Sequence, residues 1–168
     1  MGVPSGTVIR TARPSDASQL HELQEGIYAE GRWFVGHAAP PIESLRQRVR
    51  FLNPRSMLYL VAERNNQLLG WLELNRIQPQ RMQHVALLTI AIGAPWRRQG
   101  LGRALLNEAY GWAARVGISK ITLNVRSGNS GAIALYEAEG FRLEGRELEH
   151  FVTDDGYEDN LIMARSVD

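Results

Sequence analysis

Apolar residues recur every three or four positions in several parts of the chain, and this spacing predicts amphipathic helices. The segments with this pattern are 17–29, 42–52, 101–116 and 129–140. Ser15 or Asp16 can cap the first of these helices, whereas Gly117 and Gly140 stand where the last two should end. The pattern therefore predicts about four helices.

Strands are predicted where apolar and polar residues alternate, or where a short apolar run is closed by turn residues. Such segments occupy residues 8–11, 57–63, 68–75 and 121–125, and both sides of the polar turn at 153–159. Residues 84–92, HVALLTIAI, are nearly all apolar and too short before Pro95 for a helix, so we expect a strand buried on both faces at the centre of the sheet. The order strand, helix, strand from residue 84 to residue 125 implies a parallel pair joined by a right-handed crossover.

Composition and charge narrow the class of protein. The 168 residues fit one domain, expected over residues 1–168, and no repeat or linker divides them. A formal net charge of +1 argues against a nucleic-acid partner. The predicted 42–52 helix has a polar face that we interpret as exposed to solvent, formed by Arg46, Arg48 and Arg50. Without cysteine the chain has no thiol nucleophile and no cysteine metal site, and no metal is expected. Residues 1–16 lack the apolar run of a signal peptide, so a cytoplasmic protein without a membrane partner is expected.

Residues 95–106, PWRRQGLGRALL, place two arginines and two glycines between the predicted central strand and a helix. A helix start carries backbone N–H groups without partners and the positive end of the helix dipole, and glycine lets an anion approach them closely. The loop is therefore interpreted as a phosphate site, with a turn whose arginines are only solvated as the alternative. It lacks the Gly-Lys-Ser/Thr of a P-loop and the third glycine of a dinucleotide-binding fingerprint.

Two motifs connect this loop to a known family. RRQGLG resembles the R/Q-x-x-G-x-G/A signature of the GNAT superfamily of acetyl-CoA-dependent N-acetyltransferases, with Arg97, Gly100 and Gly102 at the matching positions. NSGAIALYEAEGF resembles the second signature of that family, N-x-x-A-x-x-L-Y-x-x-x-G-F. Its matching positions are Asn129, Ala132, Leu135, Tyr136, Gly140 and Phe141. With decreasing specificity, the likeness extends over roughly residues 58–164.

The resemblance implies a mixed α/β fold in which a mostly antiparallel sheet of about seven strands, flanked by about four helices, splays where the 84–92 strand parts from the 121–125 strand. Acetyl-CoA would lie in that opening as co-substrate. Its pantetheine arm would bond to the backbone of Ile90 and Ile92, and Asn129 would help to hold the arm or cap a helix. Beside Arg97, its pyrophosphate would sit on the residues Arg98, Gln99, Gly100, Leu101, Gly102 and Arg103.

The same resemblance assigns the chemistry. Tyr136 corresponds to the tyrosine that usually protonates the leaving thiolate in the family. The resemblance implies that Tyr136 also contacts the cofactor. The alternative interpretation of Tyr136 is an aromatic ring that only packs on the cofactor or the core. Many family members carry a glutamate on the central strand, but Leu87 occupies the position expected for it here. Glu73, which faces opposite to its apolar neighbours on the adjacent strand, and His84 are candidate bases, and Glu73 is preferred. Deprotonation through water without a dedicated base is equally consistent.

The resemblance implies acetyl transfer from acetyl-CoA to a primary amine of a small molecule, such as an amino acid or a polyamine. Residues expected to line the acceptor pocket are Glu25, Tyr28, Glu30, Trp33 and Phe34, together with the turn at 153–159. The C-terminal segment resembles that of family members that act on small amines, whereas a protein N-terminal or lysine acetyltransferase would need an open groove. A non-catalytic acyl-CoA-binding module is the alternative of another class, because Leu87 replaces the glutamate. The identity of the amine does not follow from the sequence, and neither does the assembly, for which a homodimer is left open.

Overall fold

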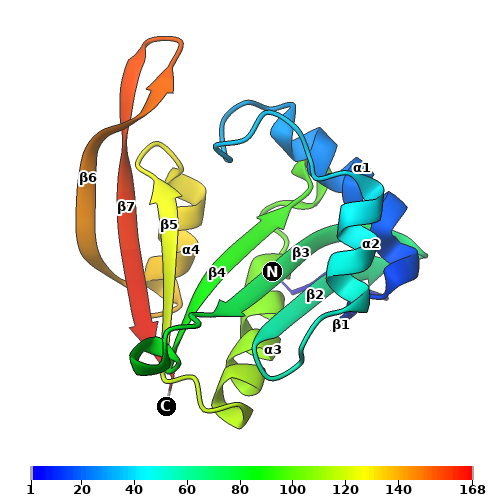
Figure 1. The fold of residues 1–168 in the computed structure, drawn as a ribbon. Helices are drawn as coiled ribbons and strands as arrows, with labels where there is room; N and C mark the ends of the chain where they lie inside the picture. Colours follow the sequence, from blue (N-terminus) through cyan, green and yellow to red (C-terminus); the bar gives the residue numbers. More distant parts are fainter. Residues whose placement is uncertain (1, 168) are drawn as a thin grey trace.

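The computed structural model describes residues 2–167, and within them seven strands form one twisted sheet flanked by four α-helices (Figure 1). The strands are β1 (Val8–Thr11), β2 (Met57–Arg64), β3 (Gln67–Arg76), β4 (Val85–Ile92), β5 (Lys120–Arg126), β6 (Arg142–Thr153) and β7 (Gly156–Ser166). The helices are α1 (Ala17–Tyr28), α2 (Ile42–Arg50), α3 (Leu101–Arg115) and α4 (Ser130–Ala138). The predicted mixed α/β fold is confirmed.

The sheet has the strand order β1-β2-β3-β4-β5-β7-β6, and its neighbouring strands are antiparallel except for β4 and β5. These two are paired only from Val85, opposite Lys120, to Leu87, opposite Thr122. Beyond Leu87 they diverge into the V-shaped opening seen in Figure 1. The predicted parallel pair, its helical crossover through α3 and the splay are therefore present.

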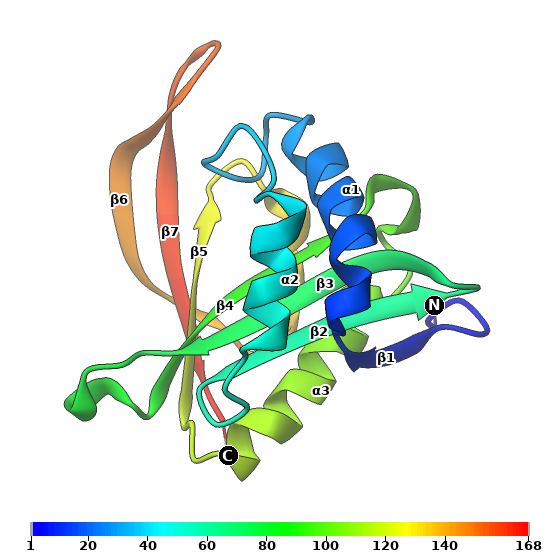
Figure 2. The ribbon, with the colours of Figure 1, turned by 45° about the vertical axis from the view of Figure 1, so that its right-hand side comes forward.

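Helices cover both faces of the half of the sheet formed by β1 to β4. Figures 1 and 2 show α1 and α2 on one face and α3 on the other. Alternation along β3 sends Leu72 and Leu74 into the core under α3, whereas Trp71 packs into the core under α1 and α2. None of the helices within residues 2–167 is both long enough and apolar enough to span a membrane.

The central strand β4 differs from the prediction that it is buried on both faces. Val85, Ala86 and Leu88 are buried, but Leu87 is 38% exposed and the residues from Thr89 to Ile92 are half-buried. The cause is the departure of β5, which leaves this end of β4 without a neighbour on one edge. The apolar run in the sequence therefore marks the wall of a cavity as well as the centre of a core.

Candidate active site

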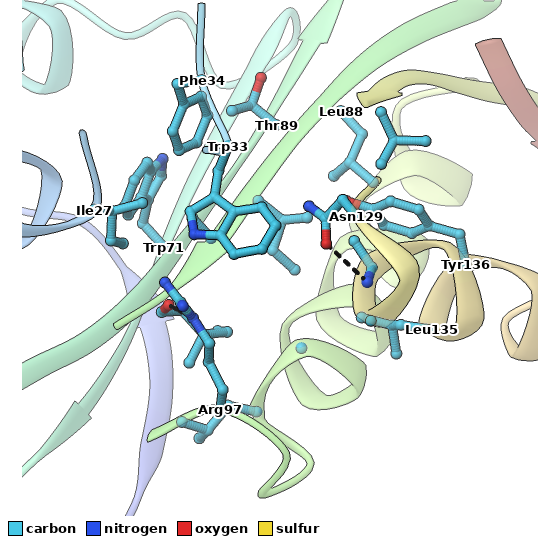
Figure 3. A pocket seen from close by; sticks show the side chains of 18 of the residues that line it. Ile27, Trp33, Phe34, Trp71, Leu88, Thr89, Arg97, Asn129, Leu135 and Tyr136 are labelled. Atoms are coloured by element: carbon cyan, nitrogen blue, oxygen red, sulfur yellow. Dashed lines mark hydrogen bonds between the residues drawn. The ribbon is translucent and has the colours of Figure 1, made fainter. Parts of the chain in front are cut away.

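A cavity of about 1390 Å³ fills the opening between β4 and β5. It is bounded by the loop between α1 and α2, by β3 and β4, by the start of α3, and by β5 and α4 (Figure 3). Sites for one drug-sized ligand usually measure about 300–1,000 Å³. The cavity is therefore larger than a site for one such ligand.

The backbone of β4 presents polar groups to this cavity. The Gly93 N–H donates to the Leu69 carbonyl of β3 at 2.8 Å. Because the backbone groups of successive residues in a strand point to opposite edges, those of Ile90 and Ile92 point away from β3 and into the opening. The Ile92 carbonyl already accepts a hydrogen bond of 2.9 Å from Arg97 Nε. The Ile90 groups and the Ile92 N–H thus form an open strand edge.

The start of α3 closes one end of this edge. Gly100 precedes the helix with a φ of 77°, and Arg98 also has a positive φ of 63°. The left-handed conformation at Gly100 turns the chain sharply into α3 without a side chain in front of the helix. The N–H groups of the first turn have no acceptor within the helix, so this end suits an anion.

Most residues of the predicted phosphate loop line the cavity. The lining residues are Arg97, Arg98, Gly100, Leu101, Gly102 and Arg103. Gln99 does not line it, because its side chain turns back and donates to the Pro95 carbonyl at 3.1 Å. The Arg103 side chain reaches the residue that follows α4 and pairs with Glu139 at 2.6 Å. The backbone of the loop, more than its side chains, therefore forms the candidate phosphate site.

Arg97 connects the end of β4 to the α1–α2 loop. Its two terminal nitrogens donate to the Glu30 carboxylate at 2.8 and 2.6 Å. Trp33 donates to the same carboxylate at 2.6 Å, and the Arg97 guanidinium lies 5.5 Å from the Trp33 ring centre. The pKa of Glu30 lies below its ordinary value, mainly because Arg97 donates these hydrogen bonds to its carboxylate. This ionic cluster fixes the loop beside the cavity.

The second motif places Asn129 and Tyr136 on the opposite wall (Figure 3). Asn129 Oδ1 accepts a hydrogen bond of 3.2 Å from the Ala132 N–H, so Asn129 caps α4. Tyr136 is only 7% exposed, yet it lines the cavity and its ring points toward Asn129. Burial, with a smaller contribution from Tyr110, raises the pKa of Tyr136. Its hydroxyl is therefore protonated at neutral pH and is an available proton donor.

Glu73 lines the cavity from β3, the neighbour of β4. It is paired in register with Thr89 of β4, and its carboxylate accepts hydrogen bonds of 2.5 and 3.0 Å from Arg48 of α2. Burial raises the pKa values of Tyr28 and Tyr59, and the negative charge of Glu73 raises both further. Glu73 is the register partner of Tyr59 on β2, and Tyr28 lines the same cavity. Glu73 therefore reaches the cavity within a cluster of polar side chains.

The other two positions considered for a base are less favourable. Leu87 lines the cavity and brings no titratable group to it. His84 does not line the cavity; it precedes β4 at the closed end of the splay, where its carbonyl accepts hydrogen bonds from the N–H groups of Ser119 and Lys120. Of the three, only Glu73 combines a carboxylate with a position in the cavity.

The predicted acceptor pocket forms in part. Tyr28 and Phe34 stack with ring centres 4.9 Å apart, and Phe34 stacks on Trp71 at 5.9 Å, which gives an aromatic wall. Glu25 faces elsewhere and accepts from the Ala39 N–H at 2.6 Å. The turn at 153–159 does not line the cavity, because the long β6–β7 hairpin carries it beyond the rest of the molecule (Figure 1).

Several polar residues of the site, among them Arg48, Asn124 and Asn160, were not identified from the sequence. Arg48 was expected in solvent, but it faces the cavity and pairs with Glu73. Asn124 and Asn160 line the opposite wall, where Asn160 donates to Asn124 Oδ1 at 2.9 Å. Arg48 follows the buried Leu45 by three residues, so it lies at the border of the apolar face of α2. This spacing could have identified Arg48 as a residue that faces the interior of the site.

Comparison with known proteins defines the class. Residues 19–141 match the family described as Acetyltransferase (GNAT) family. This match covers most of the chain and includes both motifs around the cavity. The chain therefore belongs to the GNAT acetyltransferase family.

Two curated relatives from Escherichia coli K12 are similar over part of the chain. The [ribosomal protein bS18]-alanine N-acetyltransferase is 40% identical over 83 residues, which are 49% of this chain and 56% of the relative. The L-amino acid N-acetyltransferase AaaT is 30% identical over 107 residues, which are 63% of this chain and 66% of the relative. The chain thus spans little more than half of the length of the first relative and about two thirds of the second.

Solved structures resemble nearly the whole chain. An acetyltransferase of the GNAT family from Streptococcus pneumoniae superimposes with a TM-score of 0.89 at 26% identity, covering 96% of this chain and 99% of the other. The Salmonella typhimurium protein yncA, whose structure contains its cofactor acetyl-CoA, has a TM-score of 0.88 at 18% identity, covering 98% and 95%. The second likeness concerns the fold alone.

Proposed function

We propose that this protein transfers the acetyl group of acetyl-CoA to the primary amine of a small molecule. The observation that carries the proposal is the open edge of β4, which leads to the N–H groups at the start of α3 within one cavity. Tyr136 lines that cavity from α4 and Glu73 lines it from β3. Membership of the GNAT family and the acetyl-CoA in a structural neighbour support the choice of co-substrate.

The residues of the cavity fit acetyl-CoA. Gly100 leaves the start of α3 uncovered, so the N–H groups of Leu101, Gly102 and Arg103 would hold the pyrophosphate. The Ile90 groups and the Ile92 N–H would bond to the amides of the pantetheine arm in the manner of an added strand. Arg98, which lines the same end of the cavity, adds positive charge near the phosphates. Acetyl-CoA supplies the activated acetyl group.

Tyr136 and Glu73 divide the proton transfers. An ammonium group must lose one proton before its nitrogen can attack the thioester carbon, and Glu73 would pass this proton to solvent. The C–N bond then forms and the C–S bond breaks, while the nitrogen loses a second proton to solvent. Tyr136 would protonate the departing thiolate and regain its proton from water. The overall reaction releases one proton for each acetyl group transferred.

A second candidate function is acetylation of the N-terminal amine of a protein. The 40% identity to the bS18-alanine N-acetyltransferase over 83 residues favours it. Both candidates involve a primary amine, so they share the co-substrate site and the proton transfers described above. They differ in what lies beyond the amine.

The test is an acetyl-transfer assay with the purified chain. Amino acids, polyamines, aminoglycosides and N-terminal peptides would each be incubated with acetyl-CoA, with thiol release and product mass as the two readouts. The expected result is thiol release that depends on a small amine and equals the amount of acetylated product. Acetylation of peptides alone would favour the second candidate, and binding of acetyl-CoA without turnover of any amine would contradict both.

A further inference from the structure

The pair formed by Arg48 and Glu73 lies in the acceptor half of the cavity. Arg48 extends from α2, Glu73 from β3, and both line the cavity next to the aromatic wall of Tyr28, Phe34 and Trp71. Glu73 is opposite Thr89 on β4, the strand along which the pantetheine arm would run. Thr89 is labelled in Figure 3 and shows where this half of the cavity meets β4.

The pair uses only part of its bonding capacity. Arg48 donates through Nε and Nη2, and both bonds end on the same carboxylate oxygen, Glu73 Oε2. Asn75 Nδ2 also lies 3.5 Å from Glu73 Oε2, and the Tyr59 hydroxyl neighbours the same carboxylate. Among the hydrogen bonds of residues 2–167, Arg48 Nη1 and Glu73 Oε1 have no partner. The Arg48 side chain is 47% exposed, whereas that of Glu73 is 13% exposed. A donor edge and an acceptor oxygen of opposite charge therefore remain available side by side.

We propose that this pair is the subsite for a free α-amino acid, in which Glu73 binds the α-ammonium group and Arg48 binds the α-carboxylate. The inference rests on the proposed function and names its substrate class. In an α-amino acid the ammonium and carboxylate groups are bonded to the same carbon atom. Their short separation and opposite charges complement an ion pair whose two members are in contact. Arginine suits this role because its planar guanidinium can hold a carboxylate through two donors.

The charges of the pair also disfavour the other amine classes. A polyamine has only positively charged groups, so it offers no carboxylate that could bind the Arg48 guanidinium. A peptide N-terminus has a neutral amide in place of the α-carboxylate, so it would lose the charge-assisted bonds to Arg48. The Tyr28–Phe34–Trp71 wall beside the pair is apolar and suits an apolar side chain. The substrate is therefore an α-amino acid with an apolar side chain.

This assignment completes the acceptor geometry. The Glu73 carboxylate would receive the proton that the α-ammonium must lose, and its register with Thr89 keeps the freed nitrogen beside β4. Arg48 is a positioning and specificity-determining residue, because it contacts the substrate carboxylate and takes no part in the proton transfers.

The test compares three versions of each substrate with the purified chain. Apolar L-amino acids would be assayed beside their α-amides and beside the matching amines that lack a carboxyl group. Wild type should give a kcat/KM for the acid that exceeds that for the amide at least about 10-fold, mainly through KM, since bonds to a charged group distinguish the two. In Arg48→Gln this acid-to-amide ratio should fall to about 1, and Arg48→Lys should restore part of it.

The matched control is Arg46→Gln on the same helix. Arg46 pairs with Glu43 and does not line the cavity, so its replacement should keep the wild-type ratio. A thermal shift with acetyl-CoA verifies that each variant is folded and binds co-substrate. The inference is overturned if wild type uses amides or carboxyl-free amines as well as acids, or if Arg48→Gln keeps the ratio; the proposed function survives both results. Absence of acetylation for every amine would overturn the proposed function together with the inference.

Discussion

Gly102 of the first motif lies directly against Leu135 of the second. A Cβ atom at position 102 would stand 2.8 Å from Leu135 Cδ2, which is closer than real Cβ contacts. The two motifs therefore touch at this point, and a side chain at residue 102 would force the Leu135 side chain to move.

Replacing Gly102 should destabilise the protein through this contact. Gly102→Val should lower the free energy of unfolding by about 1–3 kcal/mol, the usual cost of an overpacked site. In a Leu135→Ala background the same substitution should lower the free energy of unfolding by at most a few tenths of the cost in wild type, because the obstructing methyl group is absent. Urea unfolding of the four proteins in this cycle measures the coupling. Equal costs in both backgrounds would show that the contact is not responsible.

The charge at the start of α3 should control acetyl-CoA binding. Gly100→Asp places a carboxylate where the pyrophosphate would bind, so the thermal stabilisation by acetyl-CoA should disappear. Gly100→Asn is the matched control, because Asn and Asp both tolerate a positive φ and only Asp adds charge. The Asn variant should keep a measurable shift. If the Asp variant binds acetyl-CoA like wild type, the loop is only a turn.

Removal of the Tyr136 hydroxyl should affect turnover more than binding. Tyr136→Phe keeps the ring in its buried place but removes the proton donor, so kcat should fall about 100-fold to 10,000-fold while acetyl-CoA affinity changes little. Steady-state kinetics and a thermal shift with acetyl-CoA separate the two effects. An unchanged kcat, with the chemical step shown to be rate-limiting, would assign the acid role to water or to another hydroxyl.

Acid should weaken the fold through Asp16. Burial by itself raises the pKa of Asp16. The hydrogen bonds from Arg10 and from the Arg13 N–H together lower it by more than burial raises it, so the net pKa lies below its ordinary value. The stabilisation is thus fully present above the unfolded-state pKa of about 3.9 and is lost as pH falls through the lower folded-state value.

Asp16→Asn tests this linkage. At pH 7 it should lower the free energy of unfolding by about 1.5–3 kcal/mol, because Arg10 loses charge-assisted bonds at a buried site. The difference from wild type should shrink as the pH falls below about 4. Urea unfolding between pH 7 and pH 3 gives the two curves, with Asp154→Asn in the exposed β6–β7 turn as control. Parallel curves for wild type and Asp16→Asn would contradict the linkage.

The sequence predicted the elements well because hydrophobic spacing decides them locally. The run at 84–92, followed by glycines and an apolar helix, was enough to place β4, the loop and α3. The family resemblance then supplied the splay between β4 and β5. The exposure of Leu87 was missed because an apolar run has the same appearance whether the second face meets a core or a cavity.

Contacts between distant segments could not be predicted from local patterns. Arg97 pairs with Glu30 across 67 positions, and this contact depends on how the α1–α2 loop folds over the end of β4. Arg48 resembled its neighbours Arg46 and Arg50 in the sequence, yet the position of Glu73 on β3 gives it a partner and turns it toward the cavity. Such pairs depend on the tertiary arrangement of helices and strands.

The most direct test of the account is hydrogen exchange of the β4 amides with and without acetyl-CoA, measured residue by residue by NMR. The Ile90 and Ile92 amides face the opening, whereas those of Thr89 and Ala91 face β3 and serve as internal controls. Saturating acetyl-CoA should slow exchange at Ile90 and Ile92 by about 10-fold or more relative to Thr89 and Ala91. Equal changes at all four amides, while a thermal shift shows that acetyl-CoA is bound, would contradict the placement of the co-substrate along β4.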